Sequence, residues 1–186
     1  MSWIDIILFI FLIIIVYICF STGLIRVASV MLGMYLGLQV AALFYKIFAN
    51  ITSDGSAAST MTNQVIWFGI LWLVWSIILS LVVISFTKEY SLPKTKKWGN
   101  IDQVGGLVLG IFAGVFGILV VSYVVRNTVT MAWAAAQYPH NYMEGIVYGF
   151  DGSLLMSIFR TLKVVFLNVL SPWLPSNEIP VFTDKF

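Results

Sequence analysis

The stretch from Ile4 to Phe20, IDIILFIFLIIIVYICF, decides the class of fold. Its only charged residue is Asp5, close to its start. A helix needs about 20 mostly apolar residues to cross the hydrocarbon core of a bilayer. In hydrocarbon the backbone must satisfy its own hydrogen bonds, which favours helices over open strands. The stretch therefore predicts a membrane-spanning helix.

Further along the chain, three more stretches have the same character. They are Val27–Phe48, Val65–Phe86 and Gly105–Val125. The first and third of the four stretches are rich in bulky side chains, whereas the second and fourth carry regularly spaced glycines. We therefore predict an all-α integral membrane protein, with a transmembrane domain over residues 1–126 in which four helices form two hairpins.

The composition agrees with a membrane protein. Hydrophobic residues make up 60% of the 186-residue chain and charged residues 10%, and the mean hydropathy is +0.98. A soluble domain has about 45–50% apolar and about 25% charged residues. This composition excludes a disordered chain and argues against a water-soluble enzyme. The net charge of +2 is too small to indicate an acidic partner, so we expect the lipid bilayer, and not nucleic acid, as a partner.

The first apolar stretch is predicted to be a retained helix rather than a cleaved signal peptide. The residues at its start, Met1–Asp5, carry an acid and no Lys or Arg, and no A-x-A-like cleavage site closes it at Ser21–Gly23. Cys19, the only cysteine, lies inside the stretch. No intrachain disulfide is therefore possible, and we expect Cys19 to be a small buried or lipid-facing side chain.

The tail, residues 127–186, has apolar residues at helical spacing between about residues 153 and 171. Polar residues fall largely on the opposite face: Ser157, Arg160, Thr161, Asn168 and Ser171. This division predicts an amphipathic helix at the water–lipid interface or in a groove on the bundle, ended by the segment Ser171–Pro175. A fifth span is the alternative, but Arg160 and Lys163 would each cost about 2.5–3.5 kcal/mol in hydrocarbon.

The basic residues near the span ends predict the orientation of the chain. The first turn and the third connection lie on one side of the membrane. Together they hold Arg26, Lys88, Lys94, Lys96 and Lys97. The other side holds Lys46 and Arg126 near the membrane, with the remaining basic residues in the tail. Because short loops dominate the positive-inside rule, we expect residues 87–104 in the cytoplasm and both termini outside.

Small residues recur at every fourth position in the second and fourth predicted spans. The two sets are Ser29, Gly33, Gly37 and Ala41 in the second span, and Gly106, Gly110 and Gly114 in the fourth. Lipid gives helices no hydrophobic reason to associate, whereas small residues let two backbones approach closely. We expect these residues to pack the second and fourth helices tightly, against each other or against another subunit. A pore lined by small residues is the rival interpretation.

No catalytic or metal-binding set is recognisable in the sequence. His140 is the only histidine and Cys19 the only cysteine, which excludes the usual zinc sites. Glu144 and Asp151 are isolated acids in the tail, and no phosphate-binding loop with a following Lys-Ser/Thr is present. We therefore expect no enzymatic activity, no metal and no cofactor. Asp102 is interpreted as the N-terminal cap of the fourth helix.

Three motifs resemble the colicin V production (CvpA) family of bacterial inner-membrane proteins. The first is Trp3-Ile4-Asp5-Ile6-Ile7 followed by Thr22-Gly23-Leu24-Ile25-Arg26. The second is Asn100-Ile101-Asp102-Gln103-Val104-Gly105-Gly106, continuing to Gly110 and Gly114, and the third is the tail segment Ser171–Pro175. Six positions match the family pattern: Asp5, Gly23, Arg26, Asp102, Gly106 and Gly110. The sequence departs from the pattern at Val27, where the family often has an acid, and at Ala113, where it often has arginine.

The resemblance implies a protein of the bacterial plasma (inner) membrane, linked to production or export of a peptide toxin and to envelope integrity. It supplies no catalytic residues. One function that fits is an accessory, assembly or scaffold subunit that docks by helix contacts to other integral membrane subunits or to itself. The alternative is a small channel or transporter component, including one that forms as a homo-oligomer. The polar residues that could line its path are Gln39, Ser76, Ser80 and Ser122. The scarcity of ionisable residues within the spans favours the accessory subunit.

Overall fold

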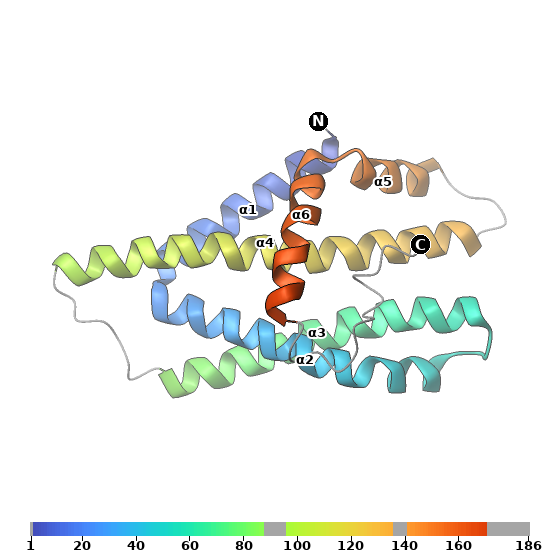
Figure 1. Ribbon diagram of the computed structural model, residues 1–186, viewed down its shortest axis with the longest axis horizontal. Helices are drawn as coiled ribbons and strands as arrows, with labels where there is room; N and C mark the ends of the chain where they lie inside the picture. The colour runs from blue at the N-terminus through green and yellow to red at the C-terminus, as the bar shows by residue number, and fades with distance from the viewer. Residues whose placement is uncertain (1, 88–95, 136–140, 171–186) are drawn as a thin grey trace.

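The computed structural model describes residues 2–87, 96–135 and 141–170 (Figure 1). These residues form six helices and no strand: α1 Trp3–Thr22, α2 Leu24–Thr52, α3 Ala57–Thr87, α4 Lys96–Ala135, α5 Asn141–Asp151 and α6 Leu154–Leu170. The first four helices are long and apolar enough to cross a membrane. The prediction of an all-α membrane fold with four spanning helices is therefore confirmed.

The long helices extend beyond the apolar stretches that predict them. α3 begins at Ala57 rather than Val65, and α4 runs from Lys96 to Ala135 rather than from Gly105 to Val125. A helix makes its backbone hydrogen bonds internally, so it can continue from hydrocarbon into water without a break. The predicted domain boundary at residue 126 falls inside α4, which thus joins the transmembrane part directly to the tail.

The helices pair differently from the predicted hairpins. α2 packs mainly against α3, and α1 packs mainly against α4, while α1 and α2 make few contacts with each other. In Figure 1, α2 and α3 lie side by side, whereas α1 slants away from the corner that it shares with α2. Only α2 and α3 therefore form a close hairpin of consecutive helices.

A single residue, Gly23, separates α1 from α2. Its φ of 91° and ψ of 162° lie in a region that residues with a Cβ rarely adopt. The Gly23 N–H donates to the carbonyl oxygen of Cys19 at 3.1 Å, which closes the last turn of α1 before the chain changes direction. The first turn of the chain is thus reduced to one residue, and its conformation splays the two helices apart.

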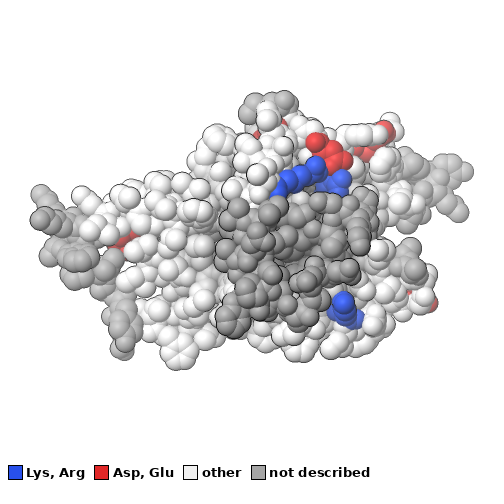
Figure 2. Space-filling model, in the orientation of Figure 1, with Lys and Arg blue, Asp and Glu red and all other residues white. Residues whose placement is uncertain are grey.

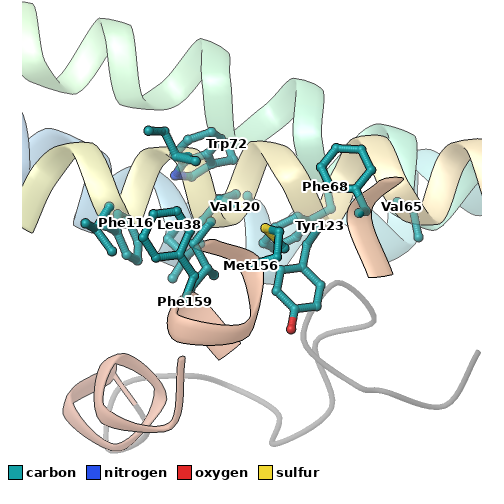
Figure 3. Packing of buried hydrophobic residues seen from close by; sticks show 14 of the residues in the cluster. Leu38, Val65, Phe68, Trp72, Phe116, Val120, Tyr123, Met156 and Phe159 are labelled. Atoms are coloured by element: carbon teal, nitrogen blue, oxygen red, sulfur yellow. The ribbon is translucent and has the colours of Figure 1, made fainter. Parts of the chain in front are cut away.

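The hydrophobic core lies between α2, α3 and α4 and continues under the start of α6. Figure 3 labels nine of its members: Leu38, Val65, Phe68, Trp72, Phe116, Val120, Tyr123, Met156 and Phe159. Trp72 is buried, and its indole N–H donates to the carbonyl oxygen of Met34 at 3.3 Å. The tail thus contributes side chains to the same core as the spanning helices.

Beyond α4, the described part of the tail forms two helices. α5 was not predicted, because Gly145 and Gly149 weaken the helical signal of its sequence. α6 agrees with the helix predicted between about residues 153 and 171, and the segment Ser171–Pro175 lies outside the described residues. α6 runs across the long helices rather than along them (Figure 1), and contacts with α1, α4 and α5 hold it there.

Candidate functional site

The small-residue face of α2 packs against α3. A Cβ added at Gly33 would lie 2.7 Å from the Cα of Ser80, and one added at Gly37 would lie 2.9 Å from the Cα of Ser76. The two backbones therefore touch, which is what small residues permit in a membrane. Ser29 and Ala41 of the same face are also buried. The predicted partner, the fourth helix or another subunit, was wrong, because α3 occupies this face.

The small-residue face of α4 packs against α1. A Cβ added at Gly106 would lie 2.7 Å from the carbonyl oxygen of Cys19, and one added at Gly114 would lie 3.0 Å from the Leu12 side chain. Gly110 lies between them, against the side chain of Cys19. Cys19 is thus a partly buried residue between two helices. Both small-residue faces are occupied within one chain.

Asp102 joins the start of α2 to α4. The Leu24 N–H donates to Asp102 Oδ1 at 2.8 Å. The first N–H groups of a helix have no partner within the helix, and they favour a nearby negative charge. The prediction that Asp102 caps the fourth helix was wrong, since α4 already begins at Lys96. Asp102 instead caps α2, at the corner where Gly23 leaves room for its carboxylate.

Asp5 joins the start of α1 to the start of α6. Its side chain is completely buried. Asp5 Oδ2 accepts the Ser2 N–H at 2.7 Å and closes a capping box on α1. Asp5 Oδ1 accepts the Ser153 hydroxyl at 2.5 Å and the Leu155 N–H at 3.0 Å. One carboxylate therefore serves two helix starts.

Ser153 caps α6 and contacts Asp5, a role that the sequence alone does not predict. Its hydroxyl donates to Asp5 and accepts the Met156 N–H at 3.1 Å, so that it caps α6. A signal for the cap alone was present, because a serine stands directly before the apolar periodicity that begins at Leu154. No pattern in the sequence indicates that Ser153 contacts Asp5, which lies 148 residues away.

Asp151 joins α4 and α6 near the same end of the bundle. Its Oδ1 accepts from Arg126 through Nε at 3.0 Å and Nη2 at 2.9 Å, and from Arg160 Nη2 at 3.0 Å. Figure 2 shows the basic and acidic groups side by side on this face. The interpretation of Asp151 as an isolated acid was therefore wrong. Two guanidinium groups share one carboxylate oxygen.

The described side chains of α6 form three strips around the helix. Successive residues are about 100° apart around an α-helix, which places these strips about 120° from one another. The first strip, Met156 and Phe159, is buried in the bundle. The other two are exposed: Leu154, Ile158 and Leu162 are apolar, and Ser157, Arg160 and Thr161 are polar. The helix thus has one face buried in the bundle, one exposed apolar face and one exposed polar face.

The comparison with protein families decides the identity of the chain. The family model for the colicin V production protein matches residues 4–161. The chain belongs to the colicin V production family. The matched range includes Asp5, Asp102 and Arg160. The four apolar helices and the family together make this chain a multi-pass membrane protein linked to colicin V production. Neither a curated protein nor a solved structure matches the chain significantly.

In this member of the colicin V production family, the matched positions fall into two groups. Gly23, Asp102, Gly106 and Gly110 lie together where α4 meets the corner between α1 and α2. Asp5 lies at the other end of α1, and Arg26 is exposed beyond the corner: these two do not join that group. The departures from the pattern, Val27 and Ala113, are both buried, where an apolar side chain needs no partner.

The polar candidates for a channel do not line a common path among the described residues. Ser76 and Ser80 face the glycines of α2, and the Ser80 hydroxyl donates to the carbonyl oxygen of Val30 at 3.3 Å. Ser122 is buried on α4. The buried Nε2 of Gln39 has no hydrogen-bond partner in the described part of the chain. These positions fit helix packing better than a shared pore.

Proposed function

We propose that this family member is an accessory or assembly subunit of the bacterial inner membrane that docks by helix contacts to other integral membrane subunits. It acts without enzymatic chemistry, and its role in toxin production or export and in envelope integrity follows from the complex that it joins. The family match and the four apolar helices support the membrane location.

The observation that carries this proposal is the open surface of α1. This helix packs mainly against α4, and the rest of its circumference is exposed. The exposed side chains are large and apolar: Ile6, Ile7, Phe9, Ile10, Phe11, Ile13, Ile14, Tyr17 and Ile18. The small-residue faces are already occupied within the chain, so docking must use a surface of this kind. Aromatic side chains are the usual anchors of protein interfaces.

The orientation and the tail complete the proposal. We place the loop 87–104 in the cytoplasm and both termini outside, because the short connections on the loop side hold half of the basic residues. Asp5 binds the start of α6 to the start of α1, so α6 lies on the outer side. Its three strips support a position at the water–lipid boundary, with the bundle beside it.

Site-specific photo-cross-linking tests the docking role. A photoreactive amino acid is placed in turn at Phe9, Ile13 and Tyr17 of α1, with Ile77 and Leu81 on the exposed face of α3 as controls. In intact cells, the α1 positions should give discrete adducts with one or a few membrane proteins, and the α3 positions should not. Adducts between two copies of the chain alone would favour a homo-oligomer. Absence of protein adducts at every α1 position would contradict the proposal.

A further inference from the structure

Arg126, Asp151 and Arg160 form a cluster with more positive than negative charge at the joint between α5 and α6. The nearby Asp5 is buried and accepts from Ser153 and Leu155 instead. Arg126 and Arg160 approach the same oxygen of Asp151 at 2.9 and 3.0 Å, so two cations share one anion. The side chains remain accessible, at 20% for Arg126 and 43% for Arg160. The sequence of α6 contains Arg160 and Lys163 and no acid. The cluster is therefore an exposed site with an excess of guanidinium donors.

The position of this cluster suits the boundary between lipid and water. Arg160 belongs to the polar strip of α6, and the apolar strip of Leu154, Ile158 and Leu162 runs along the same helix. An amphipathic helix in this position places its apolar strip among the acyl chains and its polar strip at the level of the headgroups. This step rests on the interfacial position of α6 proposed above.

We propose that Arg126 and Arg160 bind the headgroup phosphate of an anionic phospholipid. Guanidinium groups donate paired hydrogen bonds that match the geometry of phosphate oxygens. A zwitterionic headgroup brings its own cation to a cluster that is already positive, whereas an anionic headgroup does not. Asp151 holds the two guanidinium groups side by side and leaves part of their donors free for the lipid.

The test measures lipid preference with the full chain reconstituted in phosphatidylcholine vesicles that contain spin-labelled phosphatidylglycerol. The wild type should prefer phosphatidylglycerol over spin-labelled phosphatidylcholine. Arg160→Gln should lower this preference about fivefold, since it removes one of the two guanidinium groups that donate to the phosphate. Arg26→Gln is the matched control, because Arg26 is exposed at the opposite end of the bundle. An equal loss in both variants would overturn the site.

A second variant separates lipid binding from a purely structural ion pair. Asp151→Asn removes the negative charge but keeps one oxygen that can accept from Arg126 and Arg160, so a lipid site should keep or raise its preference for phosphatidylglycerol. If the cluster only holds α6 in place, Asp151→Asn and Arg160→Gln should lose the preference alike, and the proposal fails. Displacement of the labelled lipid by inorganic phosphate at constant ionic strength would also overturn it in favour of a free anion. Cross-linking from α1 tests the docking role independently of these outcomes.

Discussion

Asp5 bonds two helix starts at once, in a place that water does not reach. Its two oxygens receive hydrogen bonds from Ser2, Ser153 and Leu155. A buried donor that loses its acceptor costs far more than one that can turn to water. The carboxylate therefore fixes the first turn of α1 and the position of α6 together.

Replacement of this carboxylate should loosen the tail. We expect Asp5→Ala to lower the free energy of unfolding by about 1–3 kcal/mol, because buried donors are left without an acceptor. Asp5→Asn keeps one acceptor oxygen and should cost less. Thermal unfolding in detergent and limited proteolysis of the tail measure both effects. Asp54→Ala, in the exposed loop after α2, is the control. Equal melting temperatures of the Asp5→Ala and Asp54→Ala variants would contradict the role of Asp5.

The glycines differ in what surrounds them, and this difference predicts opposite effects of the same change. A Cβ at Gly33 would collide with the backbone of Ser80, whereas a Cβ at Gly145 would meet nothing within 4 Å. Gly33→Ala should therefore destabilise the protein by about 1–3 kcal/mol through overpacking. Gly145→Ala should be neutral or stabilise α5 by up to about 1 kcal/mol. Thermal unfolding of the two variants compares them directly, and similar melting temperatures would argue against backbone contact between α2 and α3.

At the scale of the elements, the pairing of α1 with α4 decides how the bundle is closed. α1 is the most apolar helix, yet only 17% of its span is buried, compared with 50% for α4. α4 is the central element, because it contacts each of the other five helices. A break in the pairing of α1 with α4 would also release the Asp102 cap on α2.

Disulfide cross-linking checks this pairing. The ideal Cβ of Gly114 lies 3.7 Å from the Cβ of Ile15, within the range that a disulfide needs. In a Cys19→Ser background, the pair Ile15→Cys and Gly114→Cys should form an intramolecular disulfide on mild oxidation, seen as a mobility shift that a reductant reverses. The pair Gly33→Cys and Gly110→Cys tests the α2–α4 pairing expected from the sequence, and it should stay reduced. The reverse result would show that the helices pair as the sequence suggested.

At the scale of the whole molecule, six charged residues of the described part of the chain lie in two zones, near the two ends of α1. Asp102 and Arg26 mark one end, and Asp5, Arg126, Asp151 and Arg160 mark the other. The space between them is apolar, as a bilayer requires. This distribution sets the chain across a membrane, and the short basic connections predict which end faces the cytoplasm.

Cysteine accessibility tests the orientation. In a Cys19→Ser background, Ser56→Cys in the loop between α2 and α3 should react with a membrane-impermeant maleimide in intact cells, because we place this loop outside. Arg26→Cys, on the cytoplasmic side, should react only after permeabilisation. Both residues are exposed, so access to the reagent depends on the side of the membrane. Labelling of Arg26→Cys alone in intact cells would mean that the orientation is inverted.

The sequence by itself determined the four spanning helices and α6, but not α5. The number of spans, and the helix after Ser153, follow from run length and periodicity, which depend on the bilayer thickness and on the local backbone. Only the tertiary structure decided their partners. Asp5 meets Ser153 across 148 residues, and Asp102 meets Leu24 across 78 residues. A helix start accepts any nearby anion and a small-residue face accepts any complementary helix. The chain changes direction at Gly23, and in the resulting arrangement the glycines of α2 pack against α3 and those of α4 pack against α1.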